Sequence, residues 1–461
     1  MTNKDSSLKE YALFEVTPEI ERFAKICEEK NAIDKELYTK YEVKRGLRDL
    51  NGKGVLAGLT NISDVCATKI VDGKEVPCAG NLYYRGYNIK DLVKGFLAED
   101  HYGFEEISYL LLFGELPNEK ELSTFHKTLV ERRTLPPTFV RDVIMKAPSR
   151  DMMNSLSRSI LSLYSYDSKA DDTSIPNVLR QCLNLISQFP MLMVYGYHAY
   201  NYRMGDDLFI YAPSPELSTA ENILMMLRED RKYTKLEARI LDMALVLHMD
   251  HGGGNNSTFT THVVTSSGTD TYSTIAAAMA SLKGPKHGGA NHRVMQMMEC
   301  VKEKVKDWKD EDEVEAFLEK IVRKEEGDHS GLIYGQGHAI YTLSDPRAVI
   351  LKTHAQRLAK EKGMDDEFAL YQLVEKLAPK AFLNVKGDKK VISANVDFYS
   401  GLVYKMLGLP EDLYTPMFAV SRIAGWCAHR IEEVETSNRI IRPAYKSLVD
   451  SQKYIPLDER K

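Results

Sequence analysis

The sequence lacks the features that mark membrane-inserted or exported proteins. No apolar run approaches about 18 residues, so we expect no membrane-spanning helix. The N-terminus has no apolar signal-peptide segment and no arginine before Arg22, so neither a secretory nor a mitochondrial signal is predicted. The six cysteines include no Cys-x-x-Cys pair, which indicates reduced thiols and a cytoplasmic location.

An excess of basic residues is also absent. The chain has 61 Lys and Arg against 66 Asp and Glu, for a formal net charge of −5. Proteins dedicated to nucleic acids normally present a basic surface, so no nucleic-acid partner is expected. Net charge does not describe distribution, so a local cationic pocket for a small anion stays open. The 461 residues, 43% hydrophobic and 28% charged, are typical of a folded globular protein.

Several common active-site motifs are missing. Without Gly-x-Gly-x-x-Gly, Gly-x-Ser-x-Gly and His-Glu-x-x-His, the chain has little support as a dinucleotide-binding fold, an α/β-hydrolase or a zinc protease. Residues 46–54 resemble a phosphate loop only faintly, because the spacing is one residue too long and Gly54 replaces the magnesium-binding Ser or Thr. His248 and His251 could share a metal, but no third ligand is evident, and a structural role explains them equally well.

Apolar residues recur at three- and four-residue intervals along most of the chain, which predicts an all-α fold. One of the helices begins with a capping box formed by Asn118 and Glu121. The predicted helices cover residues 104–115, 118–133, 150–166, 216–229, 235–249, 272–283, 289–305, 312–324, 346–361 and 411–434. The charged stretch 302–313 is expected to be a solvated helix end and turn.

One region departs from the helical pattern. Residues 66–77 place β-forming residues on both sides of Asp72-Gly73, a dipeptide typical of two-residue hairpin turns. We therefore expect a small β element near residues 53–85 within the helical fold.

Three glycine-flanked segments concentrate the residue types that carry chemistry. They are GPKHGGAN at 284–291, GQGHAIYTLSDPR at 335–347 and NVDFYSG at 395–401. Glycine beside His287 or His338 allows a ligand to approach the backbone closely. Taken singly, each histidine is most simply a satisfied polar group, Asp397 a helix N-cap and Arg347 a surface charge.

Taken together, the three segments resemble the citrate synthase family in residue type, order and approximate spacing. Further matching segments are YRGYNI at 84–89, LLLFGELP at 110–117, LHMDHGGGNNS at 247–257, Ser421-Arg422 and Arg442-Pro443. The resemblance covers roughly residues 45–445 and implies a two-domain helical fold. Residues 1–287 and 408–461 would form the large domain and residues 288–407 the small one.

The resemblance implies an enzyme that joins acetyl-CoA to oxaloacetate. Asp397 would remove a proton from the methyl group of the thioester, and His287 would donate a hydrogen bond to the thioester oxygen as it gains charge. His338 would polarise the ketone of oxaloacetate. The resulting citryl-CoA is hydrolysed to citrate and CoA. The resemblance implies no metal and no bound cofactor, since acetyl-CoA enters as a substrate.

Binding of oxaloacetate is implied for a second set of residues. Arg347, Arg422 and Arg442 would hold its carboxylates, because guanidinium and carboxylate form paired, charge-assisted hydrogen bonds. His251 would add a further donor. In the family the arginine equivalent to Arg442 enters the site of the neighbouring subunit, so a homodimer is expected.

CoA is expected to contact mainly the backbone of the glycine-rich segment. The residues concerned are Tyr334, Gly335, Gln336 and Gly337, with Arg48 and Lys389 as candidates for its phosphates. Three positions depart from the family pattern. Lys286 stands where an apolar residue is common, His292 where Glu or Gln is usual, and Ala394 where proline is common. None of these three residues is a predicted catalytic side chain.

Three alternatives remain open at this level. A 2-methylcitrate synthase would use propionyl-CoA through the same residues, and one methyl group changes selectivity by only about 1–3 kcal/mol. A cleavage enzyme would run the reaction from citryl-CoA. A non-catalytic helical binding protein could share the fold, although it need not keep the complete set of catalytic residues.

Overall fold

The computed structural model describes residues 16–49, 52–337, 340–341, 343–387, 392–436 and 439–460. The described residues form two compact units, one within Met1–Leu59 together with Asn201–Asp207 and the other within Thr60–Tyr200 and Leu208–Lys461. The first unit contains α1 (Pro18–Asn31) and α2 (Lys35–Lys40), N-capped by Thr17 and Asp34. In the described part, no helix is long and apolar enough to cross a membrane.

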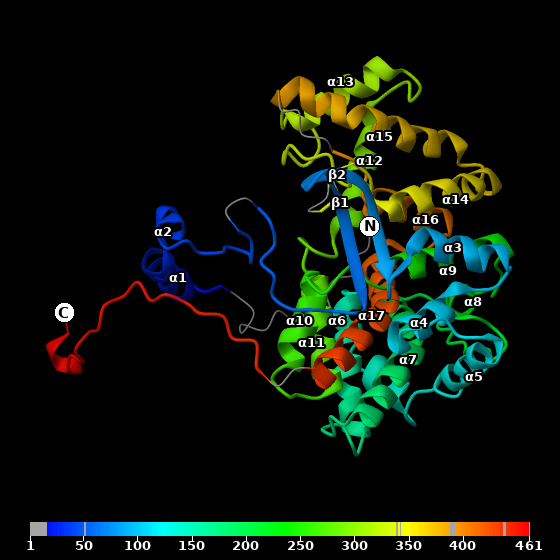
Figure 1. Cartoon of the computed structure of the whole chain (residues 1–461), viewed down its shortest axis with the longest axis horizontal. Coiled ribbons are helices and arrows are strands. Elements are labelled where there is room, and N and C mark those ends of the chain that lie inside the picture. The colour runs from blue at the N-terminus through cyan, green and yellow to red at the C-terminus, as the bar shows by residue number, and fades with distance from the viewer. Residues whose placement is uncertain are drawn as a thin grey trace. The chain divides into compact units, whose positions relative to one another are not determined.

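Most of the chain is helical, as predicted (Figure 1). The longer helices are α3 (Ile89–Ala98), α4 (Gly103–Phe113), α5 (Glu119–Val130), α6 (Met152–Leu163), α7 (Ile175–Met204), α8 (Thr219–Leu227), α9 (Lys235–His248), α10 (Asn256–Thr265), α11 (Thr271–Lys283), α12 (Ala290–Lys304), α13 (Glu311–Val322), α14 (Pro346–Lys362), α15 (Asp365–Lys386), α16 (Val396–Met406) and α17 (Tyr414–Thr436). Short π or 3₁₀ segments are Val140–Ile144, Tyr164–Tyr166, Glu411–Leu413 and Leu457–Glu459.

The ten predicted helices are all present, with bounds that differ by at most three residues. Both halves of the capping box at Asn118 and Glu121 are formed. The charged stretch 302–313 contains the end of α12 and the start of α13, as expected. The predicted set omits α1, α2, α3, α7, α10, α15 and α16. Helix α7 is buried on most of its surface, so it lacks the one-sided apolar stripe by which a partly exposed helix is identified.

The predicted hairpin is confirmed as part of a three-stranded antiparallel sheet. Strands β1 (Ser63–Val71) and β2 (Lys74–Tyr84) pair with Val71 opposite Lys74, and β3 (Tyr87–Asn88) pairs with β2. Asp72 and Gly73 have φ angles of 50° and 75°, as the two central residues of a type I′ turn require. A phosphate loop leads into a helix, and residues 55–62 contain none, which agrees with the rejection of residues 46–54 as such a loop.

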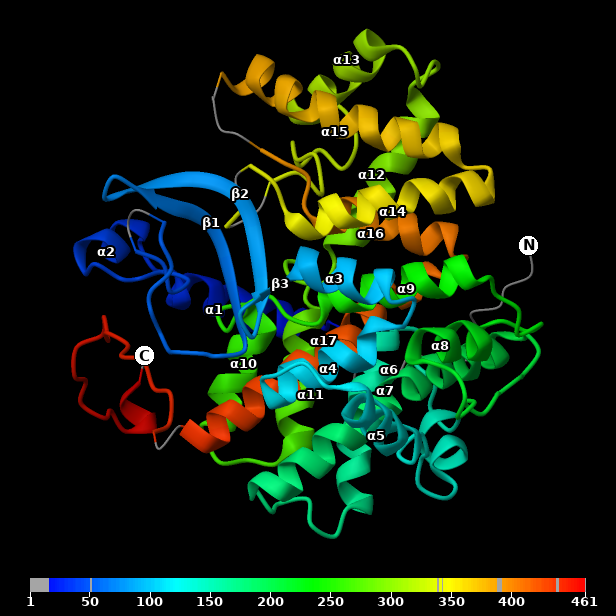
Figure 2. The same ribbon diagram turned by 45° about the vertical axis from the view of Figure 1, so that its right-hand side comes forward.

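Two groups of helices position the candidate site. Helix α17 is buried along most of its length and packs against α4, α9, α10 and α11. Helices α12 to α16 pack on one another, with α13 beside α15 and α14 beside α16, and they lie together in both views (Figure 2). The first turns of α14 and α16 in the second group carry two of the predicted site residues, Arg347 and Asp397.

Candidate active site

His287 lies in the turn between α11 and α12 and is half-buried. Its Nε2 lies 3.0 Å from Ser257 Oγ and 3.4 Å from the Ser257 backbone nitrogen. Because a backbone N–H can only donate, Nε2 is the acceptor, and the neutral ring carries its proton on Nδ1. Burial, together with the Arg422 cation, lowers the pKa of His287 to about 4. The ring is therefore a neutral hydrogen-bond donor at physiological pH.

Asp397 lies on the first turn of α16. Asn395 is the N-cap of this helix and accepts a hydrogen bond from the Asp397 backbone at 3.0 Å, so the interpretation of Asp397 as the N-cap is wrong. Burial raises the pKa of Asp397, Arg347 and Arg422 lower it and Asp345 raises it, and the balance of these effects is a pKa of about 6. The carboxylate is thus a stronger base than an exposed aspartate.

Arg347 is buried rather than exposed, so its interpretation as a surface charge is wrong. Its side chain is 4% exposed and pairs with Asp345 through Nε at 3.1 Å and Nη2 at 2.8 Å. Asp345 also caps α14 by accepting the Arg347 backbone N–H and accepts the Val396 backbone N–H at 3.1 Å. This one carboxylate therefore fixes the guanidinium and joins the starts of α14 and α16.

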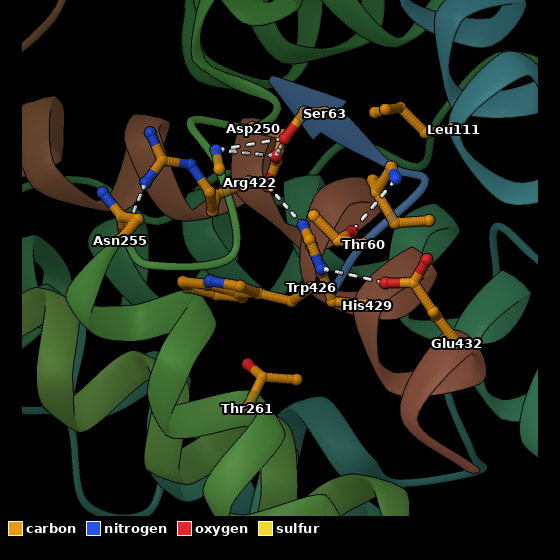
Figure 3. Close-up of polar contacts among 12 residues, drawn as sticks. Thr60, Ser63, Leu111, Asp250, Asn255, Thr261, Arg422, Trp426, His429 and Glu432 are labelled. Atoms are coloured by element: carbon orange, nitrogen blue, oxygen red, sulfur yellow. Dashed lines mark hydrogen bonds and ion pairs between the residues drawn. The ribbon is translucent and has the colours of Figure 1, made fainter. Parts of the chain in front are cut away.

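Arg422 supplies a second buried cation from α17. Its Nε donates to the His248 carbonyl at 2.8 Å, and its Nη1 donates to Asn255 Oδ1 at 3.3 Å (Figure 3). Burial lowers the pKa of Arg422, Asp250 raises it and Arg347 lowers it. Arg347, Arg422, His287 and Asp397 are thus linked electrostatically, because Arg422 acts on the pKa of both His287 and Asp397, and Arg347 acts on that of Asp397.

His251 borders this group through an aromatic contact. Its ring lies 5.5 Å from that of Tyr341, edge to face, and the Tyr341 ring lies 6.0 Å from the Arg347 guanidinium. His248 is fully buried, and its ring stacks on Phe418 at 3.8 Å. Among the described residues, the one cluster close enough for a metal includes neither histidine, so the structure does not support metal binding by this pair.

The glycine-rich segment is held against the start of α16. Gly337 N–H donates to Ser393 at 2.7 Å, Asn395 N–H donates to Gly335 at 2.9 Å, and Asn395 Nδ2 donates to the Gly337 carbonyl at 2.9 Å. Gly335 has a φ of 75°, and a Cβ there would lie 2.8 Å from the side chain of Phe398. The Gln336 side-chain amide is buried and has no hydrogen-bond partner among the described residues. Glycine at 335 is thus required by both conformation and close packing.

The remaining predicted residues belong to other parts of the chain. His338 and Lys389 lie outside the described residues. Arg48 belongs to the first compact unit, where its Nη1 donates to the Gly52 carbonyl at 2.9 Å. Arg442 is exposed and lies in residues 439–456, which contain no helix or strand. The Tyr334 hydroxyl, on a residue predicted to contact CoA, donates to Asp328 at 2.6 Å.

The structure adds residues to which the sequence assigned no role. Asp250 is fully buried and accepts hydrogen bonds from the Ser63 hydroxyl and the Gly252 N–H, and His429 lies beside it (Figure 3). Burial alone would raise the pKa of Asp250, but His429, Ser63 and Arg422 together lower it to about 2. Ser257 accepts from Trp426 Nε1 at 3.2 Å and contacts His287. Asp250 and Ser257 both lie within the LHMDHGGGNNS segment, and the resemblance of that segment to the family is the sequence signal that could have indicated them.

Comparison with known proteins identifies relatives over nearly the whole chain. The family model described as "Citrate synthase, C-terminal domain" matches residues 49–444. A citrate synthase of Haloferax volcanii is 34% identical over 426 residues, which are 91% of this chain and 99% of that protein. A 2-methylcitrate synthase of Shewanella oneidensis is 32% identical over 385 residues, which are 82% of this chain and 92% of that protein.

A solved structure is similar over the same extent. It is the ternary complex of carboxymethyl coenzyme A and oxaloacetate with the citrate synthase of Thermoplasma acidophilum. Its TM-score is 0.73 at 28% sequence identity, and the alignment covers 91% of this chain and 100% of that one.

Proposed function

Because the chain belongs to the citrate synthase family, whose members are acyl-CoA-dependent condensing enzymes, we propose that it joins acetyl-CoA to oxaloacetate and hydrolyses the citryl-CoA to citrate and CoA. This reaction usually serves the tricarboxylic acid cycle. The observation that carries the proposal is the Asp397 carboxyl, whose pKa of about 6 reflects a buried position influenced by Arg347 and Arg422. Asp397 supplies a base, and the two arginines that act on its pKa supply cations for binding a dicarboxylate.

Asp397 and His287 divide the proton-transfer step between them. Asp397 removes a proton from the methyl group, for which its raised pKa makes it a better base than an exposed aspartate. His287 donates from Nδ1 to the thioester oxygen as the enol forms, and its lowered pKa keeps it neutral while it does so. One donor of this kind stabilises a transition state by about 3–4 kcal/mol.

The two buried arginines have donors left for the carboxylates of oxaloacetate. Arg347 uses Nε and one N–H of Nη2 on Asp345, and among the described residues Nη1 has no hydrogen bond, so Nη1 is proposed to bind a ligand. Arg422 is held by His248 and Asn255 through Nε and Nη1. In this proposal His251 contributes a further donor and His338 polarises the ketone, and both roles rest on the family resemblance.

We propose that a homodimer completes the site, with Arg442 entering the neighbouring subunit. Arg442 lies in an exposed terminal segment that carries several large apolar side chains in contact with water. They are Tyr445, Val449, Tyr454 and Leu457, each at least 76% exposed. Apolar residues at such density indicate a surface that packs against another chain.

The remaining parts of the proposal concern CoA and the domains. CoA is proposed to contact residues 334–337, with Arg48 and Lys389 as candidates for its phosphates. The backbone N–H groups of Gln336 and Gly337 already donate to Ile333 and Ser393, so this contact would depend on other backbone groups of residues 334–337. Residues 288–407 are proposed to close over the substrates as a small domain, which the mutual packing of α12 to α16 supports. The compartment proposed from the cysteine pattern is the cytoplasm.

The test is thiol release from acetyl-CoA in the presence of oxaloacetate. The CoA substrates are supplied in large excess over enzyme, because the chain's own six cysteines react with thiol reagents. Asp397→Asn should abolish release while retaining oxaloacetate binding, and Asp91→Asn, an exposed control on α3, should leave both unchanged. Thiol release by Asp397→Asn at the wild-type rate would contradict the assignment of the base.

A second candidate function is supported by one of the comparisons. The relative from Shewanella oneidensis is a 2-methylcitrate synthase at 32% identity, close to the 34% of the citrate synthase relative. The same assay with propionyl-CoA distinguishes the two functions. A higher kcat/KM for propionyl-CoA would replace the acetyl-CoA proposal, and cleavage of citryl-CoA without condensation would indicate the reverse reaction.

A further inference from the structure

Two helices bring together a cluster of side chains that the condensation does not use. His262 lies on α10, and His429 and Glu432 lie on α17. One ligand atom from each of the three lies within 4.8 Å of the other two. His262 Nε2 is 3.1 Å from His429 Nδ1, which in turn is 3.8 Å from Glu432 Oε2. In the part of the chain that the structure describes, no other group of His, Cys, Asp or Glu is gathered so closely.

The two imidazoles face each other through one ring nitrogen each, and each ring has a carboxylate beside its other nitrogen. His262 Nδ1 lies 2.7 Å from the carboxylate of Glu433, and His429 Nε2 lies 3.2 Å from that of Asp250. A carboxylate only accepts hydrogen bonds, so a ring that binds a metal through its inner nitrogen carries its proton on the outer nitrogen, beside the carboxylate. The inner nitrogens, His262 Nε2 and His429 Nδ1, then present two lone pairs to each other. A cation between them removes this repulsion.

Glu432 supplies a third electron pair at the same place. Its Oε1 accepts the Asn61 backbone N–H at 2.6 Å. Its Oε2 is buried and accepts no hydrogen bond from any described residue, and the side chain as a whole is 9% exposed. A buried carboxylate oxygen without a donor is unfavourable unless a cation lies beside it. Arg85 acts on Glu432 electrostatically, but it donates its hydrogen bonds to the Leu111 carbonyl.

We propose that His262 Nε2, His429 Nδ1 and Glu432 Oε2 bind a divalent cation of the zinc class, with water as a fourth ligand. Imidazole with one carboxylate is a common donor set for Zn²⁺. In a tetrahedral site with bonds of about 2.0–2.1 Å, two ligand atoms lie about 3.3 Å apart, close to the separation of the two imidazoles. Glu433 and Asp250 occupy the positions of the carboxylates that orient metal-bound histidines.

The site would be structural and separate from the reaction. It would fasten α10 to α17 about one and a half helical turns beyond Ser257, the residue that contacts His287. Through His429 it would also hold Asp250, whose chain leads directly into His251. The cation would therefore stabilise the framework on which the active-site residues are mounted, without touching a substrate.

The experiment measures Zn²⁺ binding to the full-length protein after chelator treatment, by titration calorimetry and metal analysis. Wild type should bind a single Zn²⁺ per chain. Glu433→Gln, which changes only an orienting partner, should weaken binding by about 10- to 100-fold. His262→Gln and Glu432→Gln should weaken it further. His126→Gln, on α5 and outside the cluster, should leave affinity unchanged.

Two additional measurements test for a cysteine ligand and for misfolded variants. Co²⁺ bound at the site should give the visible absorption of a tetrahedral site with nitrogen and oxygen ligands, without a thiolate charge-transfer band. A thiolate band would show that a cysteine is a ligand and would overturn the proposal. Circular dichroism and condensing activity without added metal check that the variants fold. Absence of saturable Zn²⁺ binding by wild type, or equal affinity in all variants, would also overturn the proposed metal site. In that case a proton shared between His262 and His429 would be the cation between the two rings.

Discussion

Replacement of Asp345 by asparagine tests the buried ion pair on which the position of Arg347 depends. Asp345 Oδ1 accepts from the backbone N–H and Nε of Arg347, and Oδ2 accepts from Arg347 Nη2 and the Val396 N–H. An amide has one accepting oxygen. Whichever way the substituted side chain turns, its NH₂ group faces two donors, and Arg347 becomes a buried charge without its partner.

The expected loss follows from the burial of both partners. Their side chains are 4% and 0% exposed, and breaking such a pair from one side destabilises a protein by about 3–5 kcal/mol. Unfolding entropy is about 2.1 cal/mol/K per residue, so for 461 residues 1 kcal/mol corresponds to about 1 °C in Tm. Asp345→Asn should therefore lower Tm by about 3–5 °C.

The assay is thermal unfolding at one scan rate, with Asp310→Asn as the matched control. Asp310 also caps a helix, α13, by accepting backbone N–H groups, but it is exposed and forms no ion pair with any residue that the structure describes. Asparagine and aspartate are similar as N-caps, so this control should change Tm by less than about 1 °C. Equal losses in the two variants would refute the reasoning, because the loss could then not come from the buried charge of Arg347.

Three further predictions follow from the site. The value of kcat/KM should fall by about tenfold per pH unit below about 6, because Asp397 must be ionised to act as a base. In Asp345→Asn this fall should begin at a lower pH, because Asp345 raises the pKa of Asp397. A fall that begins only near the ordinary aspartate pKa in wild type would contradict the prediction. Co-expression of Arg442→Ala with Asp397→Asn should restore about a quarter of wild-type thiol release, because about half of the dimers are mixed and each mixed dimer has one intact site of two. Absence of restoration would place Arg442 in the site of its own subunit. Gly335→Ala should lower Tm more than Gly86→Ala does. Both glycines have positive φ, but of the two only Gly335 has neighbouring side chains that a Cβ would meet. Equal changes in Tm would show that these close contacts at Gly335 play no part.

The residues that the sequence assigned to the site are those whose signals are local. His287 and Arg347 stand beside Gly, Pro or Asp residues that shape the adjacent turn or helix start. Asp345 precedes Pro346, an arrangement typical of a helix N-terminus, yet its pairing with Arg347 and its bond to Val396 were not predicted. The bond to Val396 joins positions 51 residues apart, and helical periodicity carries no information at that range.

The sequence by itself determined the helical class, the Asp72-Gly73 hairpin and the family, because these depend on short-range periodicity, turn chemistry and motif order. Tertiary structure alone decided the protonation states of Asp397 and His287, because a pKa responds to burial and to charges brought from distant helices. It also decided that His262 on α10 meets His429 and Glu432 on α17, which are 167 and 170 positions away in the chain. Packing of helices, and not spacing along the chain, brings both sets of residues together.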